Sequence, residues 1–330
     1  MWGAFRTHLG QSHWSADEKA SIVEYLMLLG GLAGLFFGGE ALVRGSVGIA
    51  RRLSMSSLLI GLTVVGFGTS TPELLVSLDA ALRGVPDIAL GNVVGSNIAN
   101  ILLIVGVSAL VWPIAVSGGT LGRDTAVMLA AAIILIPIFA LGEVGSIAGC
   151  VMFAGLVTYL LVAYRQSQSQ PVNEDAPTDP SVPGGALWVS VLWVVAGLVL
   201  LMVGARFLVD GSVTIARSFG VSEAFIGLTI VAVGTSLPEL ATSLIAALRK
   251  QSEIAIGNIV GSNIFNILGI LGLTAAISPI PVAARFLSFD LPVMIAVSLL
   301  LTVLLRRPSI GRPVGLVMLI GYGVYVWAAQ

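Results

Sequence analysis

The chain has 330 residues, of which 57% are apolar and 10% charged, with a formal net charge of −1 and a mean hydropathy of +1.02. Soluble domains carry about 25% charged residues, so the composition excludes a soluble protein and predicts a polytopic membrane protein whose main partner is the lipid bilayer. The near-zero charge gives no basis for nucleic-acid binding, and the lone Cys150 excludes an intramolecular disulfide.

Residues 1–21 form a polar N-terminal tail without the apolar segment of a signal peptide. After this tail the chain contains apolar stretches of the length that crosses a bilayer, roughly 20 residues. We predict ten transmembrane helices, at approximately 22–48, 56–82, 87–112, 123–141, 146–165, 186–214, 222–248, 253–277, 287–306 and 311–329.

The polar segment 166–185 is typical of a flexible linker, and it separates two halves, 22–165 and 186–330, with five predicted spans each. Five is odd, so the second half must enter the membrane from the opposite face. We therefore predict an all-α fold of two inverted five-helix repeats, in which a midplane site forms between the repeats. Nine Lys and Arg residues follow odd-numbered spans and five lie on the other face, which places both termini outside the cell (inner) membrane.

A duplicated stretch supports this division. Residues 61–102 recur at 227–268, at a constant offset of 166 residues, with 28 identities in 42 positions. Similarity of this length and density indicates an internal repeat.

The first helix of each half carries a charge pair with its signs exchanged, since Glu40 and Arg44 align with Arg206 and Asp210. Each pair has the i, i+4 spacing of an ion pair on one helix face. The pairs either neutralise their own helix locally or form a contact between the two helices that breaks and re-forms during transport.

Each copy of the repeat has a glutamate directly after a proline, Glu73 after Pro72 and Glu239 after Pro238. A proline lacks an N–H group, so Pro72 should break the helix and leave the Gly68 carbonyl unpaired, and Pro238 should do the same in the second copy. Within lipid an unpaired carbonyl is costly unless a polar group or a cation takes it. Two buried acids beside two broken helices therefore indicate a functional site.

Other oxygen donors surround the two acids. Hydroxyl groups come from Thr69, Ser70, Thr235 and Ser236, and the second half of each motif adds Asn92, Ser96, Asn97 and Asn100, with Asn258, Ser262, Asn263 and Asn266. Asn100 and Asn266 are candidate ligands, whereas Asn92 and Asn258 are expected to tie helices together. The glycines at 91, 95, 257 and 261 are interpreted as close packing positions. Asp79 has no counterpart in the second copy, because position 245 is an isoleucine, so it is not expected in a symmetric site, although it could carry a proton or line an access path.

This ligand set is made of oxygens, and both histidines, His8 and His13, lie in the N-terminal tail. Such a set suits a hard cation: Ca²⁺ takes six to eight oxygens in a flexible shell, sodium accepts a smaller one, and Mg²⁺ fits less well. Two glutamates balance one Ca²⁺ or two Na⁺, so one site could hold either ion in turn, as an antiporter requires. The ions are cargo, and no resident cofactor is expected.

The paired GTSxPE and GNxxGSNxxNI motifs, at 68–73 with 91–101 and at 234–239 with 257–267, resemble the two alpha-repeats of the cation/calcium antiporter superfamily. The chain is most similar to its short prokaryotic sodium/calcium exchanger members. The resemblance implies a core of spans 2, 3, 7 and 8, across which spans 1 and 6 slide. The ion ligands it implies are Glu73, Thr69, Ser70, Ser96, Asn100 and the Gly66 carbonyl, with Glu239, Thr235, Ser236, Ser262, Asn266 and the Ala232 carbonyl.

One departure from the family concerns charge. Some relatives have an aspartate where this chain has Asn100 or Asn266, which leaves two acids here and keeps the stoichiometry and any K⁺ requirement open. We predict an antiporter that exchanges Ca²⁺ for Na⁺, with a proton-coupled or potassium-dependent antiporter as the alternative. A cation channel and an intramembrane enzyme are rivals from other classes. Inverted repeats with one occluded midplane site argue against the channel, and saturable counter-ion-dependent flux would separate it from an antiporter. Detectable proteolysis or hydrolysis would favour the enzyme.

Overall fold

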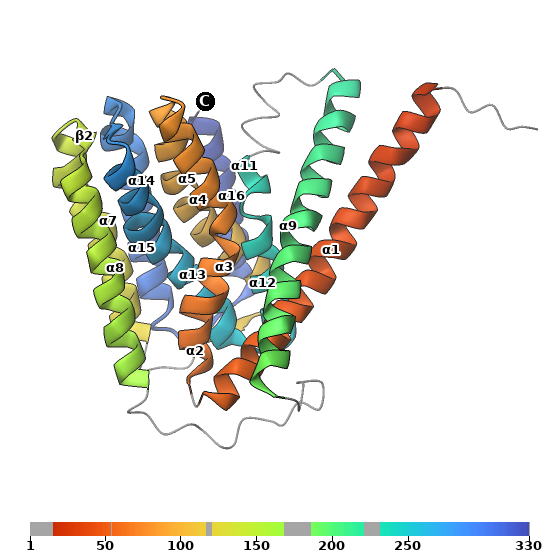
Figure 1. The fold of residues 1–330 in the computed structure, drawn as a ribbon, viewed down its shortest axis with the longest axis horizontal. Helices are drawn as coiled ribbons and strands as arrows, with labels where there is room; N and C mark the ends of the chain where they lie inside the picture. Colours follow the sequence, from red (N-terminus) through yellow and green to blue (C-terminus); the bar gives the residue numbers. More distant parts are fainter. Residues whose placement is uncertain (1–15, 54, 117–120, 168–185, 221–231, 330) are drawn as a thin grey trace, which may run out of the picture.

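The computed structural model describes residues 16–53, 55–116, 121–167, 186–220 and 232–329, and this part is almost entirely helical (Figure 1). The long helix α1 (Ala16–Arg52) opens the first half, and α7 (Leu121–Ala140) and α8 (Ser146–Ser167) close it. Between them lie two interrupted helices, in which η marks a π-helical turn. They comprise α2 (Ser57–Ile60), η1 (Gly61–Val65), α3 (Gly66–Thr69) and α4 (Thr71–Leu82), then α5 (Pro86–Ala99), η2 (Asn100–Ile104) and α6 (Val105–Val111).

The second half follows the same order. It begins with α9 (Leu187–Ser218), and its later elements match the first half at the offset of 166 residues. They are α11 (Ala232–Gly234), α12 (Leu237–Leu248), α13 (Ser252–Ile264), η4 (Phe265–Leu271), α14 (Gly272–Ile277), η5 (Phe286–Asp290), α15 (Leu291–Leu304) and α16 (Arg312–Ala328).

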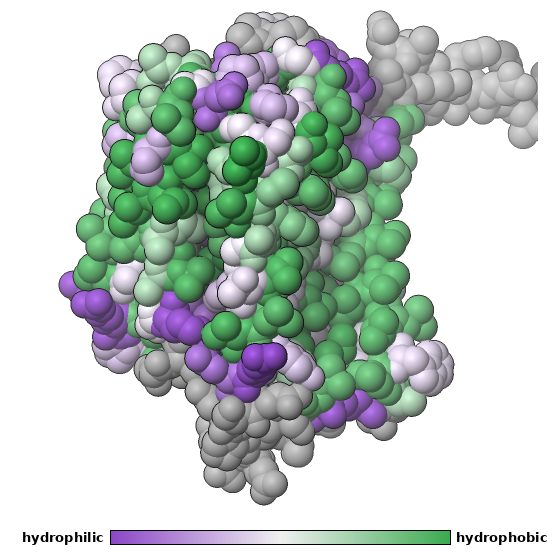
Figure 2. All heavy atoms as spheres, turned by 60° about the vertical axis from the view of Figure 1, so that its left-hand side comes forward, coloured by the Kyte–Doolittle hydropathy of each residue, from purple (hydrophilic) through white to green (hydrophobic). Residues whose placement is uncertain are grey.

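Seven helices of the described residues are long and apolar enough to cross a membrane, and the bent pair Ser57–Thr69 with Thr71–Leu82 makes an eighth candidate. The helices α12 and α16 are shorter, and the predicted span 222–248 begins in residues outside the described part. Ten spans therefore stay a prediction. Hydrophobic side chains cover the middle of the surface and hydrophilic ones gather towards its two ends (Figure 2), as in an integral membrane protein.

The equivalent helices α1 and α9 run antiparallel along each other at one side of the molecule (Figure 1). Glycines bring their backbones together: a Cβ on Gly34 would lie 2.9 Å from the Gly204 Cα, and one on Gly45 would lie 2.7 Å from the Ser190 carbonyl oxygen. Small residues allow this approach between helices in lipid, where dispersion contacts drive association.

Two short strand pairs, which the sequence did not predict, join the halves. Strand β1 (Ile114–Ala115) pairs with β4 (Ser309–Ile310), and β2 (Glu143–Val144) pairs with β3 (Ile280–Pro281). Because β1 and β2 flank α7 while β3 and β4 flank α15, the pairing makes these two equivalent helices antiparallel as well.

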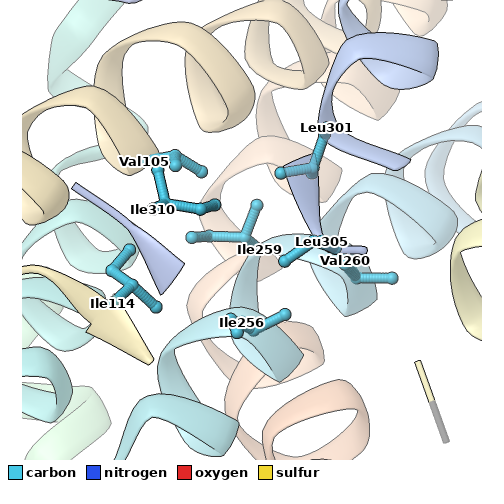
Figure 3. A pocket seen from close by; sticks show the side chains of 8 residues that line it. All are labelled: Val105, Ile114, Ile256, Ile259, Val260, Leu301, Leu305 and Ile310. Atoms are coloured by element: carbon cyan, nitrogen blue, oxygen red, sulfur yellow. The ribbon is translucent and has the colours of Figure 1, made fainter. Parts of the chain in front are cut away.

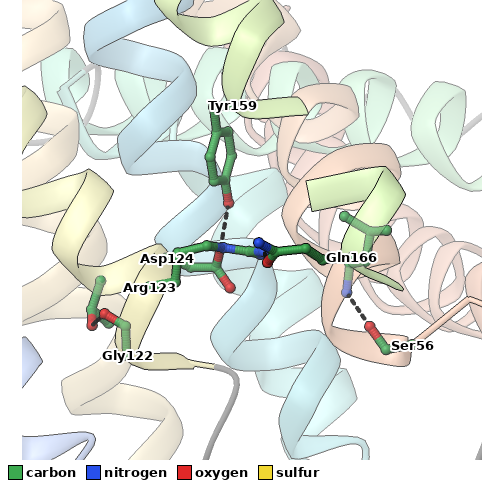
Figure 4. Close-up of polar contacts among 8 residues, drawn as sticks. Ser56, Gly122, Arg123, Asp124, Tyr159 and Gln166 are labelled. Atoms are coloured by element: carbon green, nitrogen blue, oxygen red, sulfur yellow. Dashed lines mark hydrogen bonds and ion pairs between the residues drawn. The ribbon is translucent and has the colours of Figure 1, made fainter. Parts of the chain in front are cut away.

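A buried aspartate–tyrosine pair also occurs in each half. The Tyr159 hydroxyl of α8 donates to Asp124 of α7 over 3.1 Å, and Arg123 pairs with the same carboxylate (Figure 4). At the offset of 166 residues, the Tyr325 hydroxyl of α16 donates to Asp290, also over 3.1 Å. Asp124 is 0% exposed and Asp290 3%, so each pair holds an outer helix to its neighbour through a desolvated contact.

The interrupted helices occupy the centre. In the stretch Ser252–Ile277, 94% of the apolar window is buried inside the protein, against 28% for Leu187–Ser218, although the latter is the more apolar. The more buried helix is therefore the less apolar one, because the central helices carry polar residues that the surrounding helices shield from lipid.

Candidate cation site

The breaks that the prolines predict are present. The helix bends by 45° between Thr69 and Thr71, and Pro72 and Pro238 stand in the first turns of α4 and α12, where a missing N–H costs little. Both glutamates thus lie in the first turn of a helix, where the peptide dipoles favour a negative charge.

Each glutamate is bound by a serine of the other half. The Ser70 hydroxyl donates to Glu239 Oε1 over 2.8 Å, and the Ser236 hydroxyl donates to Glu73 Oε1 over 3.3 Å. Both glutamates are 1% exposed. These crossed bonds bring the two broken helices together and make one site from two half-sites.

The Gly66 carbonyl, Thr69 and Ser262 also meet across the halves. The Ser262 hydroxyl donates to the Gly66 carbonyl oxygen over 3.2 Å. The Thr69 hydroxyl lies 3.1 Å from the Val65 carbonyl oxygen, 3.3 Å from the Gly66 carbonyl oxygen and 3.2 Å from Asn258 Oδ1. A hydroxyl has one proton, so Thr69 can satisfy only one of these acceptors at a time. The others keep lone pairs that a cation could use.

The amides at 92 and 258 tie helices together, as predicted. Asn92 Nδ2 donates to the Glu73 carbonyl over 2.9 Å and to Ser77 Oγ over 2.8 Å. Asn258 makes the equivalent bonds, at 3.2 and 2.8 Å, to Glu239 and Ser243. Ser77 and Ser243 were not among the predicted site residues, although their identity in both copies of the repeat was a signal.

Asn100 and Asn266 are both 1% exposed. Asn100 Nδ2 donates to Asn263 Oδ1 over 3.1 Å, and its own Oδ1 has no hydrogen-bond partner in the described part of the chain. Neither amide atom of Asn266 has a partner there. Asn100 begins the π-helical turn η2, a distortion that is frequent at functional sites.

For the remaining predicted ligands, the structure gives the position in the fold and the burial. Ser96 is buried on α5, one turn before Asn100, and Thr235 is partly buried between α11 and α12. Ala232 is the first residue of α11 and directly follows residues outside the described part.

Asp79 lies apart from these groups. It is 59% exposed and pairs with Arg83 one turn along α4 at 2.7 Å. The two predicted pairs on α1 and α9 also form, Glu40 with Arg44 and Arg206 with Asp210, the latter at 3.6 Å. Glu40 is bound in addition by Arg249, which follows α12.

Four buried oxygens of the site lack hydrogen-bond partners among the described residues: Glu73 Oε2, Glu239 Oε2, Asn100 Oδ1 and Asn266 Oδ1. Unpaired buried acceptors, two of them on carboxylates, are costly in a low-dielectric interior. Carboxylate and amide oxygens of this kind are the ligands that a hard cation prefers. The aliphatic cavity lined by Ile256, Ile259, Leu301 and their neighbours (Figure 3) has no such oxygen and cannot take this role.

The model of the sodium/calcium exchanger protein family matches residues 23–165 and again 189–329. This chain belongs to the sodium/calcium exchanger family. It is 39% identical over 310 residues to the putative antiporter CaxA of Alkalimonas amylolytica, covering 91% of this chain and 97% of that one. It is 34% identical over 342 residues to the sodium/calcium exchanger MaX1 of Methanosarcina acetivorans, covering 92% and 97%.

Among solved structures, the exchanger fold is matched by the sodium-calcium exchanger NCX_Mj soaked with 2.5 mM Na⁺ and 0.1 mM Ca²⁺. The TM-score is 0.80 at 34% identity, and the match covers 94% of this chain and 99% of that one. The recognition of a prokaryotic exchanger of the cation/calcium antiporter superfamily is thereby confirmed. This exchanger is a transmembrane cation antiporter, and its relatives are transporters rather than enzymes.

Proposed function

We propose that this exchanger extrudes Ca²⁺ in exchange for entering Na⁺ by alternating access at one midplane site. The observation that carries the proposal is the crossed binding of two buried glutamates by serines of the opposite half, at 2.8 and 3.3 Å. Two carboxylates neutralise one Ca²⁺ or two Na⁺, so the two ions compete for the same oxygens.

The proposed ligands are the side chains of both motifs together with two backbone carbonyls. They are Glu73, Thr69, Ser70, Ser96, Asn100 and the Gly66 carbonyl, with Glu239, Thr235, Ser236, Ser262, Asn266 and the Ala232 carbonyl. The unpaired buried oxygens on Glu73, Glu239, Asn100 and Asn266 support this set. Exchangers named for Na⁺ and Ca²⁺ among the relatives support the choice of ions.

We further propose ten spans in two inverted repeats, with both termini outside the inner membrane. The antiparallel courses of α1 with α9 and of α7 with α15 support the inversion. The excess of Lys and Arg in the loops after odd-numbered spans supports the orientation. Protonation of the same carboxylates in place of Na⁺ binding is the alternative coupling.

Uptake of ⁴⁵Ca²⁺ into proteoliposomes tests the proposal. Outward gradients of Na⁺, K⁺ and H⁺ are compared for the wild type, Glu73→Gln, Glu239→Gln and the control Glu143→Gln, an exposed residue of β2. We expect uptake that requires internal Na⁺, is lost in the first two variants and persists in the control. Uptake driven by the pH gradient alone would show that the coupling ion is H⁺ rather than Na⁺. Undiminished uptake in both site variants would refute the site.

A further inference from the structure

We propose that Asn263 is a positioning residue, which turns the amide of Asn100 so that its oxygen faces the transported cation. The inference rests on the proposed cation site and adds a residue that is not among its ligands. Asn263 is 0% exposed on α13, and its Oδ1 accepts the hydrogen bond from Asn100 Nδ2 at 3.1 Å.

The direction of this bond decides which end of Asn100 is available to a cation. An amide has an oxygen that accepts and an NH₂ group that donates. A cation is attracted by the oxygen and repelled by the NH₂ group. Because Asn100 uses its NH₂ group on Asn263, its Oδ1 remains buried and without a partner in the described part of the chain.

Asn263 is itself held in one orientation by α7. Its Nδ2 lies 3.6 Å from the sulfur of Met128, which is 0% exposed. A thioether sulfur is an acceptor only, although a weak one. The chain Met128–Asn263–Asn100 therefore has a fixed donor-to-acceptor direction that ends in a free oxygen at the site.

The equivalent residues of the other half lack this arrangement, which isolates the effect of Asn263. Asn97 Nδ2 donates to the Val93 carbonyl of its own helix over 2.7 Å. Asn266 has no described partner for either amide atom. In this conformation, the structure thus orients one of the two proposed ligand amides through a cross-repeat hydrogen bond, and the other has no such bond among the described residues.

The test is equilibrium ⁴⁵Ca²⁺ binding to the purified full chain in lipid nanodiscs without Na⁺. The variants are Asn263→Ala, Asn100→Ala, the double variant and Met128→Leu. Loss of a partner that orients a metal ligand costs about 10–100-fold in affinity, so we expect at least a tenfold loss for Asn263→Ala and a smaller loss for Met128→Leu. The decisive result is non-additivity: in the Asn100→Ala background, Asn263→Ala should change the Ca²⁺ affinity by less than about twofold.

A merely structural role would give a different result. Asn263→Ala would then lower the melting temperature and weaken Ca²⁺ binding equally in both backgrounds, and this additivity would overturn the inference. Binding unchanged in Asn263→Ala would overturn it as well. Wild-type protein that neither binds Ca²⁺ nor shows Na⁺-dependent uptake would instead refute the proposed function.

Discussion

The glycine at 261 offers a sharp test of the packing around the site. A Cβ at Gly261 would lie 2.3 Å from the Leu62 carbonyl oxygen and 2.6 Å from the Leu62 Cα, whereas ordinary contact begins at 3.4 Å. The obstacle is backbone on η1, which cannot rotate away as a side chain could. Gly261→Ala must therefore push α13 and η1 apart by about 1 Å, the difference between the clash and van der Waals contact.

That displacement acts directly on two bonds across the halves. Ser262, the next residue, is bonded to the Gly66 carbonyl at 3.2 Å, and Thr69 lies 3.2 Å from Asn258; both contacts would exceed hydrogen-bond range. Overpacking costs about 1–3 kcal/mol, and each lost bond adds about 1 kcal/mol. We expect a lower melting temperature and, because the Gly66 carbonyl moves, Ca²⁺ affinity at least about tenfold weaker, equivalent to about 1.4 kcal/mol.

The assay is thermal unfolding and equilibrium Ca²⁺ binding of Gly261→Ala beside Gly155→Ala. Gly155 is exposed on α8, and no described atom lies within 4 Å of a Cβ built there. Since alanine favours a helix over glycine by up to about 1 kcal/mol, the control should be as stable as the wild type or more so. A Gly261→Ala protein with wild-type melting and affinity would refute the reasoning.

Three further substitutions distinguish residues that act on Ca²⁺ binding from residues that act on transport rate or on stability. Ser70→Ala removes the 2.8 Å donor that positions Glu239, together with a proposed hydroxyl ligand. It should weaken Ca²⁺ binding by at least about tenfold, since a hydrogen bond to a charged group is worth about 1.5–3 kcal/mol; unchanged binding would argue against the crossed bonds. Glu40→Gln weakens the ion pair between α1 and Arg249 and should change the maximal uptake rate with little change in the half-saturating Ca²⁺ concentration, and the reverse pattern would contradict this. Tyr159→Phe removes the hydroxyl that donates to buried Asp124 (Figure 4) and should lower the free energy of unfolding by about 1–3 kcal/mol. The Ca²⁺ affinity should stay unchanged, and a changed affinity would contradict a purely structural role of this pair.

The broken helices and the central acids were predictable from the sequence, because proline acts on its own helix. Pro72 lacks a backbone N–H and bends its helix locally, and because the stretch is duplicated, Pro238 predicts the same break in the second copy. The packing role of Gly257 and Gly261 is confirmed against η1. At Gly91 and Gly95 the equivalent partner segment, 221–231, lies outside the described residues.

The partners of the polar residues were not predictable, because they depend on how the halves meet. Nothing in the spacing of Ser70 shows that it binds the glutamate 169 positions away rather than the one in its own helix. The direction of the Asn263–Asn100 bond likewise depends on Met128, which belongs to a different predicted span. Asp124 and Asp290 did leave a signal, since they share the offset of the repeat, but it lies downstream of the aligned motif.

The crossed bonds also bear on which part of the exchanger can move. Separating the two broken helices would remove the serine donors from both glutamates at once, so opening the site within the core would leave two buried carboxylates without them. Helix α9 faces the core differently: Cβ atoms on Gly68 and Gly234 would meet its side chains Leu198 and Val209. Helix α1 lies closer to the backbone of α12, since a Cβ on Gly39 would be 3.3 Å from the Ala241 carbonyl oxygen. The side-chain contacts of α9 can be exchanged at lower cost than the hydrogen bonds of the core, and on this ground we propose that α1 and α9 move over a stationary site. The Glu40–Arg249 ion pair is then a restraint on that movement, and the separation of uptake rate from Ca²⁺ affinity in Glu40→Gln is the measurement that distinguishes a moving α1 from a fixed one.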